Sequence, residues 1–238
     1  MNLNRILYSM CYDMLEQKHT AYKTENGLAI ACSETPLWIW LAQNTDARLF
    51  FHEFLRQNEN PLTGIVAEKE IALACAEIYG KDFSQKGLVS YFLPPEATLP
   101  GVAIPGELRL SGAPEMPLIF EWIHAFYSET LHAEMPGGGD SSPGLSSARL
   151  FIWHDSQPVA MGLLTGEGET CRINLIYVSP EFRGKGYGRA VVCALAKKAR
   201  KSEQLPVLYT DSENAAANGL YTALGFREAG RLLEVTFN

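Results

Sequence analysis

The sequence predicts an α/β protein with a smaller N-terminal domain over residues 1–100 and a larger C-terminal domain over residues 106–238. Three observations predict this class. Short apolar runs alternate along the chain with segments whose apolar residues recur at helical spacing. A stretch rich in proline, residues 94–105, separates the two halves. A chain of 238 residues with 47% hydrophobic residues can bury one large core or two small ones.

The N-terminal domain is predicted from elements that alternate in type. A helical apolar stripe lies within residues 6–15, and the expected strands and apolar runs are 27–32, 37–41, 65–67 and 88–93, with helices over 47–57 and 68–79. This half has no glycine-rich turn that could bind an anion. Its expected role is therefore structural, either covering the sheet, walling an acceptor pocket or forming the surface of a homodimer.

The C-terminal domain is predicted as a strand, a helix and a flexible loop, followed by three strands and then alternating helices and strands. Its expected strands are 107–110, 149–154, 159–165, 171–178 and 205–211, its helices are 117–131, 188–201 and one that follows residues 211–214, and a Gly/Ser-rich loop covers 136–147. Gly225 stands where a left-handed residue ends the last helix.

One turn of this domain has the composition of an anion-binding site. The apolar strand that begins at Ile173 runs into Arg183-Gly184-Lys185-Gly186-Tyr187-Gly188, and the next helix starts there. Glycines let main-chain N–H groups approach an anion without a Cβ in the way, and a helix start adds unpaired N–H groups. A P-loop is excluded because Lys185 is followed by Gly186, and a dinucleotide fingerprint is excluded because its third glycine would fall at Arg189. The alternative is a helix start that merely needs glycine.

A second motif follows about thirty residues later in the sequence. It consists of Asn214, Asn218, Tyr221 and the pair Gly225-Phe226. The turn resembles the Arg/Gln-x-x-Gly-x-Gly/Ala motif of the GNAT superfamily of N-acyltransferases, and the second motif resembles the ending of many of its members. The resemblance covers residues 106–238 and implies a mixed central sheet flanked by helices. The N-terminal half resembles a degenerate copy of this pattern by its element order alone.

The resemblance also implies a co-substrate, acetyl-CoA or another acyl-CoA, and residue roles. The strand that ends at Val178 would splay from its neighbour, the Val178 N–H would stabilise the oxyanion, and Tyr221 would protonate or hydrogen-bond the departing thiolate. The residues that the resemblance assigns to coenzyme binding are Ile176, Tyr177, Val178, Arg183, Gly184, Lys185, Gly186, Tyr187, Gly188, Arg189, Asn214 and Asn218. Tyr221 could instead be a core aromatic residue, and the two asparagines could cap and brace their helix.

The group that deprotonates the acceptor amine is open at this point. An alkylammonium with a pKa near 10.4 is only about one part in 2,500 neutral at pH 7, whereas an α-amino group needs little help. Glu129, His132 and Glu134 follow the first helix of the C-terminal domain and are candidates for the base, although each could be a solvated helix-end residue.

Composition excludes other classes of function. A net charge of −7 argues against a nucleic-acid binder, yet seven of the 20 basic residues lie within residues 183–201 and could attract an anion locally. The five cysteines and five histidines are scattered, which favours a reducing compartment and no metal site. No apolar run reaches the roughly 20 residues that span a bilayer, so a cytoplasmic protein without a membrane partner is expected.

These observations predict an N-acyltransferase that moves an acetyl or other short acyl group from acyl-CoA to an amine of a small molecule, peptide or protein. The alternative from another class is a noncatalytic acyl-CoA sensor or scaffold. In a third hypothesis, the N-terminal half is chiefly an interaction module.

Overall fold

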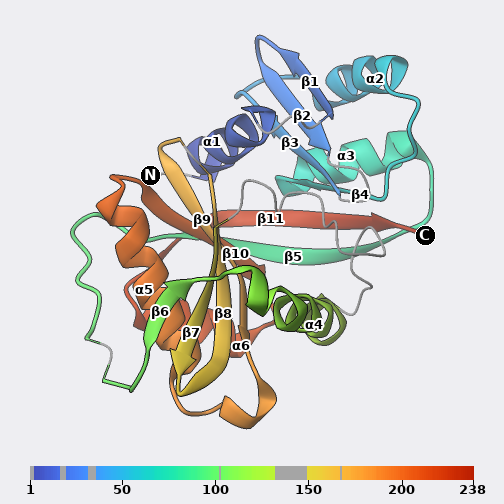
Figure 1. The fold of residues 1–238 in the computed structure, drawn as a ribbon. Helices are drawn as coiled ribbons and strands as arrows, with labels where there is room; N and C mark the ends of the chain where they lie inside the picture. The colour runs from blue at the N-terminus through green and yellow to red at the C-terminus, as the bar shows by residue number, and fades with distance from the viewer. Residues whose placement is uncertain (1–2, 17–19, 32–35, 102, 132–148, 167) are drawn as a thin grey trace. The chain divides into compact units, whose positions relative to one another are not determined.

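The computed structural model describes residues 3–16, 20–31, 36–101, 103–131, 149–166 and 168–238 (Figure 1). Contacts divide the chain into two compact units. Unit 1 comprises Met1–Tyr91, Tyr209–Asn218 and Glu228–Asn238, and unit 2 comprises Phe92–Leu208 and Gly219–Arg227. Both units therefore use residues from the C-terminal part of the sequence. The division into domains at 1–100 and 106–238 stays a prediction, because contacts do not test which segment folds alone.

Unit 1 is a sheet with helices on both faces. Its strands are β1 (Thr20–Thr24), β2 (Gly27–Ala31), β3 (Leu37–Leu41), β4 (Gly64–Ala67), β5 (Phe83–Phe92) and β11 (Arg227–Phe237), and its helices are α1 (Leu3–Glu16), α2 (Ala47–Gln57) and α3 (Lys69–Tyr79). The strands follow the order β1-β2-β3-β4-β11-β5. The neighbours β3 and β4 run parallel, whereas β4 and β11 run antiparallel.

The two faces of this sheet follow from the alternation of side chains along each strand. On one face, Leu7 of α1 packs in a cluster with Ile30 and Leu232. On the other face, phenylalanines of α2 and small residues of α3 pack against Ile39 and Leu233. Leu232 and Leu233 are adjacent in β11 and belong to different clusters, so β11 contributes apolar residues to both layers.

Unit 2 is built from a further run of paired strands and the helices that cover them. Its elements are β6 (Glu107–Leu110), the helical turn Ala113–Glu115, α4 (Met116–Phe126), a π-helical segment (Tyr127–Leu131), β7 (Arg149–Asp155), β8 (Gln157–Thr165), β9 (Thr170–Val178), the 3₁₀ turn Pro180–Phe182 and α5 (Tyr187–Lys201). β10 (Leu205–Asp211) and α6 (Ala215–Ala223) each contribute residues to both units. The strand order is β10-β9-β8-β7-β6.

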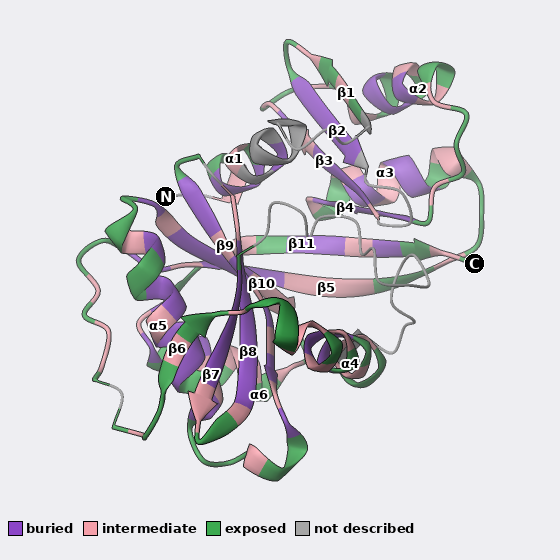
Figure 2. Ribbon diagram, viewed as in Figure 1, coloured by how far each residue is buried: buried purple, intermediate pink, exposed green. Residues whose placement is uncertain are grey.

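Helices α4 and α5 cover opposite faces of these strands. Ile119 and Ile123 of α4 pack in a cluster with Met161 and Leu163 of β8. Gly162, which lies between these two residues, faces side chains of α5. Figure 2 shows that buried residues follow β9 and the inner side of α5, whereas the turn before α5 is exposed.

Most elements expected from the sequence are confirmed. The helix 47–57 has the predicted bounds, and Gly225 takes a left-handed φ of 87° after α6. Three details differ. Strand β1 was not expected, strand β5 starts at Phe83 with half-buried and exposed residues, and the helix expected over 117–131 changes to a π-helical segment at Tyr127. Polar residues carry little periodic apolar signal, which is why the first part of β5 was missed.

The element order of the first half recurs in the second. The series β1-β2-β3-α2-β4-α3-β5 has the same order of strands and helices as β7-β8-β9-α5-β10-α6-β11. This repetition makes the connection from β3 to α2 the counterpart of the glycine-rich connection from β9 to α5.

Candidate active site

Strand β9 carries a β-bulge just before its end. Its pairs with β8 pass from Leu163↔Asn174 to Met161↔Tyr177, so β9 has one more residue than β8 in this interval. Leu175 adopts a left-handed φ of 49°, and its N–H donates to the Asn174 side chain at 2.9 Å. A bulge bends its strand and re-aims the residues that follow. Here it sets the direction of the strand end at Val178.

Gly162 is opposite this bulge on β8. A Cβ at this position would lie 2.6 Å from a side-chain carbon of Leu195, 2.8 Å from one of Ile176 and 2.8 Å from one of Val191. Glycine is therefore needed for α5 to pack closely on the bulged part of the sheet. The side chain of Ile176, which was expected to contact the coenzyme, faces this packed layer.

The main chain of Val178 has a free edge. The Ser179 N–H donates to the Val159 carbonyl on β8 at 3.1 Å, so the pair Val178↔Ala160 is of the non-hydrogen-bonded kind, and the Val178 N–H points away from β8. On the other side, the register of β10 on β9 covers only the pairs from Leu205↔Thr170 to Val207↔Arg172. Among the described residues, the end of β9 thus has no strand paired along this edge.

The turn between β9 and α5 carries a row of unpaired main-chain amides. Gly184 and Gly186 have φ values of 75° and 92°, which glycine adopts without strain. Within the described part of the chain, the N–H groups of residues 184–189 donate to no acceptor, and the first bond of α5 runs from Ala190 to the Gly186 carbonyl. Alternating backbone conformations of this kind make an anion-binding concavity. We call residues 184–189 the amide cradle.

The side chains around the amide cradle are basic or directed inward. Lys185 and Arg189 are exposed, and the Lys185 ammonium lies 5.0 Å from the centre of the Phe182 ring. Tyr187 is buried, and its hydroxyl donates to Asp155 at 2.5 Å. This hydrogen bond is the main cause that raises the pKa of Tyr187. The main chain of Tyr187, and not its phenol, is thus available at the cradle.

Arg183 directs its side chain to protein groups. Its Nε donates to the Val178 carbonyl at 3.0 Å, and its Nη2 lies 2.7 Å from Oε2 of Glu129. The guanidinium also lies 5.4 Å from the centre of the Tyr177 ring. Tyr177 itself is buried against α4, and its hydroxyl is 3.4 Å from Oε1 of Glu129. Burial, and then the Glu129 carboxylate, raise the pKa of Tyr177, so it stays a neutral phenol that can donate this bond.

The two asparagines of the second motif bond to the protein. Asn214 accepts from the Ala217 N–H at 3.0 Å and so caps α6. The Asn218 amide donates to the carbonyls of Asp211 and Asn214, and its oxygen accepts from the Tyr91 hydroxyl at 2.9 Å. These bonds correspond to the capping and bracing alternative, and both asparagines belong to unit 1.

Tyr221 belongs to unit 2, in contrast to the two asparagines on its helix. Its side chain is 9% exposed, and its ring centre lies 6.0 Å from that of Phe226. Tyr221 thus has the buried, aromatic surroundings of a core residue, which is the alternative that the sequence left open.

Other predicted features fall outside what the structure describes. His132, Glu134 and the loop 136–147 lie outside the described residues.

Within the described ranges, no group of three or more His, Cys, Asp or Glu side chains could hold a metal ion. No helix among the described residues has both the length and the apolar character needed to cross a membrane.

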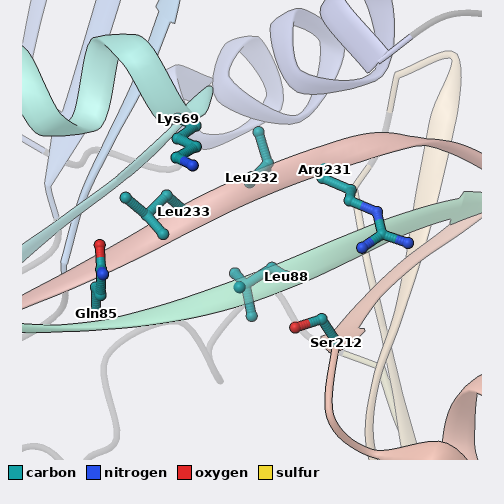
Figure 3. Close-up of a pocket in the computed structure, with 8 residues that line it drawn as sticks. Lys69, Gln85, Leu88, Ser212, Arg231, Leu232 and Leu233 are labelled. Carbon is teal, nitrogen blue, oxygen red and sulfur yellow. The ribbon is translucent and has the colours of Figure 1, made fainter.

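Unit 1 contains a pocket of about 340 Å³ between the start of α3, strands β5 and β11, and Ser212 (Figure 3). Its lining residues are Lys69, Gln85, Gly87, Leu88, Ser212, Arg231, Leu232 and Leu233. Arg231 is paired with Glu228 at 3.0 Å. The sequence assigned no site residue to this lining.

Sequence reasoning missed the residues that position the site. The bulge at Leu175 and the Tyr187–Asp155 bond leave no local pattern, because each depends on a partner on another element. The one available signal was Gly162, a glycine inside an apolar strand, which often marks a bulge or a close approach.

The site is thus an α/β domain with a bulged strand that has a free edge, followed by unpaired main-chain amides at a helix start. A sequence model of the acetyltransferase (GNAT) family matches residues 116–226. A comparison with curated proteins gives no match.

Solved structures of similar fold cover nearly the whole chain. A GCN5-related N-acetyltransferase from Kribbella flavida has a TM-score of 0.66 at 13% identity and covers 100% of this chain and 96% of its own. A GCN5-related N-acetyltransferase-like protein from Streptococcus suis has a TM-score of 0.62 at 12% identity, with 96% and 92% covered. An acetyltransferase of the GNAT family from Colwellia psychrerythraea has a TM-score of 0.56 at 16% identity, with 99% and 94% covered. At these identities the likeness concerns the fold.

Proposed function

We propose that the protein is an N-acyltransferase that moves an acetyl or other short acyl group from acyl-CoA to an amine of a small molecule, peptide or protein. The observation that carries this proposal is the amide cradle, residues 184–189, whose N–H groups have no acceptor among the described residues. The match of the acetyltransferase family model to residues 116–226 supports the same reaction class.

The residues of the amide cradle fit the diphosphate of CoA. Consecutive N–H groups and the positive end of α5 favour a doubly charged anion. A Cβ on Gly184 would meet nothing within 4 Å, so the surface above this residue is open. Lys185 and Arg189 add positive charge at the same place. When bound, the coenzyme supplies a thioester whose acyl group can be transferred.

The chain's own residues then have separate tasks. The Val178 N–H, which points away from β8, would hold the carbonyl oxygen of the thioester and would stabilise the charge that develops on it. By the resemblance of its motif, Tyr221 would stand beside the departing sulfur. An unperturbed phenol, with a pKa near 10, is a weaker acid than a thiol near 8.5, so a hydrogen bond to the sulfur serves as well as full proton transfer.

Release of free CoA thiol from acetyl-CoA, measured across a panel of amines, tests this proposal. Tyr221→Phe should slow turnover and leave the affinity for CoA unchanged. Tyr22→Phe is a matched control, because Tyr22 is a half-buried tyrosine of unit 1 that packs against Phe50. Binding of CoA without thiol release for any amine would favour the noncatalytic sensor or scaffold.

A further inference from the structure

We infer that the pocket of unit 1 is a second binding site, and that its ligand is a small organic anion with an apolar part. This inference goes beyond the proposed acyl transfer and does not rest on it. All the residues that line the pocket belong to unit 1, and none of them belongs to the amide cradle. The inference is carried by two cations, Lys69 and Arg231, in a lining that includes no acidic residue among the described ones.

The pocket is formed by four segments that lie far apart in the sequence. Lys69 begins α3, Gln85 to Leu88 belong to β5, Ser212 follows β10, and Arg231 belongs to β11. Figure 3 shows the Arg231 side chain directed from β11 toward Leu88 and Ser212. A volume of about 340 Å³ is at the lower end of the range for small-molecule sites. The pocket therefore suits a small ligand.

The register of the sheet explains why the two cations meet in one pocket. Strands β4 and β11 run antiparallel, and Ala67 pairs with Leu233. In an antiparallel ladder, two residues forward on one strand correspond to two residues back on the other. The same register, continued past the end of β4, places Lys69 at the level of Arg231. Both side chains line the pocket.

The protein itself supplies little negative charge to these two cations. Among the described residues, the Lys69 ammonium has no hydrogen-bond or ion-pair partner. Arg231 pairs with Glu228 at 3.0 Å, but the two side chains are 69% and 44% exposed, and so open a pair contributes little to stability. Like charges in one pocket repel each other. An anion bound between them would remove this repulsion.

The geometry of Arg231 leaves the end of its guanidinium free. Side chains three residues apart on a regular strand point to opposite faces, yet Glu228 and Arg231 are paired, so β11 departs from regular alternation between them. The pair uses the Nε of Arg231. Within the described part of the chain, its two Nη groups donate to no acceptor. Two N–H groups in this fork can bind a carboxylate or a phosphate in a bidentate way.

The rest of the lining combines a hydroxyl group with apolar side chains. A Cβ on Gly87 would lie 2.6 Å from Oγ of Ser212, so the glycine leaves room for this hydroxyl. Leu88, Leu232 and Leu233 supply apolar surface. A few polar groups within a partly apolar lining are typical of sites for organic molecules. We therefore expect an organic anion to bind more tightly than an inorganic one.

Calorimetric titration of the full chain with hexanoate and with hexyl phosphate tests the inference. We expect one saturable site for at least one of these anions, with a Kd of about 1 mM or lower. The tighter of the two identifies the anionic group. The alcohol 1-hexanol, which has the same chain and no charge, should bind about 10-fold more weakly or worse. Hexylamine, a cation at pH 7, should not bind, and inorganic phosphate should bind about 10-fold more weakly than hexyl phosphate.

Two variants and a matched control locate the site. Arg231→Gln and Lys69→Gln should each weaken binding of the preferred anion about 10-fold or more. Arg56→Gln is the control, because Arg56 is an exposed arginine of α2 that pairs with Glu53, also three residues earlier, and does not line the pocket. Its Kd should stay within twofold of the wild type. All three positions are exposed, so thermal unfolding should show folded variants.

Four results would overturn the inference. The first is no saturable binding of either anion at two temperatures, and the second is equal affinity for 1-hexanol. The third is an equal loss of affinity in Arg231→Gln and Arg56→Gln, which would make the attraction one of net charge. The fourth is inorganic phosphate binding as tightly as hexyl phosphate. Absence of CoA binding would instead remove the proposed function and leave this inference standing.

Discussion

Replacing Gly184 with alanine changes the amide cradle without filling any space inside the protein. Gly184 has a φ of 75°, and a Cβ there would meet no atom within 4 Å. A non-glycine residue in this left-handed conformation costs roughly 1–2 kcal/mol. Because nothing packs on this exposed position, we expect the free loop to relax to another conformation. Binding of CoA must then restore the cradle, which should weaken the affinity about 5- to 30-fold.

Gly80 provides a control with the same strain at a different place. It ends α3 in unit 1 with a φ of 73°, and a Cβ there would lie 3.9 Å from the nearest atom. Its N–H bonds to the Ala76 carbonyl at 3.1 Å, so the residue is held in place, and Gly80→Ala should lower stability without changing CoA affinity. Isothermal titration calorimetry and chemical denaturation measure both quantities. An affinity of Gly184→Ala within twofold of the wild type would refute the reasoning.

Three further predictions concern stability and reactivity. Gly162→Ala should destabilise the fold by about 1–3 kcal/mol through overpacking, whereas Gly219→Ala, in open space on α6, should stabilise it by about 0.5–1 kcal/mol. Denaturant unfolding measures both changes in the free energy of unfolding, and changes of the same sign would contradict the prediction. Burial raises the pKa of Cys75 to about 12, so iodoacetamide at pH 8 should modify it roughly a thousandfold more slowly in the native than in the unfolded chain; comparable rates, read by peptide mass spectrometry, would contradict this. Asp155 raises the pKa of Tyr187 in the folded state, so the contribution of their hydrogen bond to stability is present below about pH 10 and is lost at higher pH. Tyr187→Phe should flatten this loss of stability with rising pH in unfolding curves, and an unchanged loss would contradict the prediction.

The amide cradle could be predicted from the sequence because its signal is local. Gly184 and Gly186 are needed for their own φ values, and the helix start that follows has an apolar stripe of its own. Helix α2 could be predicted for the same reason, because its apolar periodicity and its capping residue, Asp46, lie within a few positions of each other. A structural feature that is determined by residues close together in the sequence leaves a pattern from which it can be predicted.

The surroundings of the cradle depend on distant partners and could not be predicted in this way. Arg183 is part of the family motif, yet its side chain bonds Glu129, which lies 54 positions earlier in the chain. The pairing of β11 with β4, for example Leu233 with Ala67, likewise joins the end of the sequence to its first half. No spacing rule identifies such pairs.

The repeated order of elements places a counterpart of the amide cradle between β3 and α2, and in this counterpart a carboxylate of the protein accepts the hydrogen bonds of the free N–H groups. Asp46 stands at the start of α2, and its side chain accepts from the N–H groups of Arg48 at 2.9 Å and Leu49 at 3.1 Å. The carboxylate thus takes the place at this helix start that an anionic ligand would need. In α5 the corresponding position is Gly186, which has no side chain to fill it. We therefore expect one coenzyme site for each chain.

Calorimetric titration of the full chain with CoA tests the central claim most directly, that the amide cradle exists to hold a diphosphate. The account predicts a saturable heat of binding with one CoA for each chain, weakened in Gly184→Ala and kept in Gly80→Ala. Absence of binding heat at several temperatures, or two equivalent sites for each chain, would contradict it.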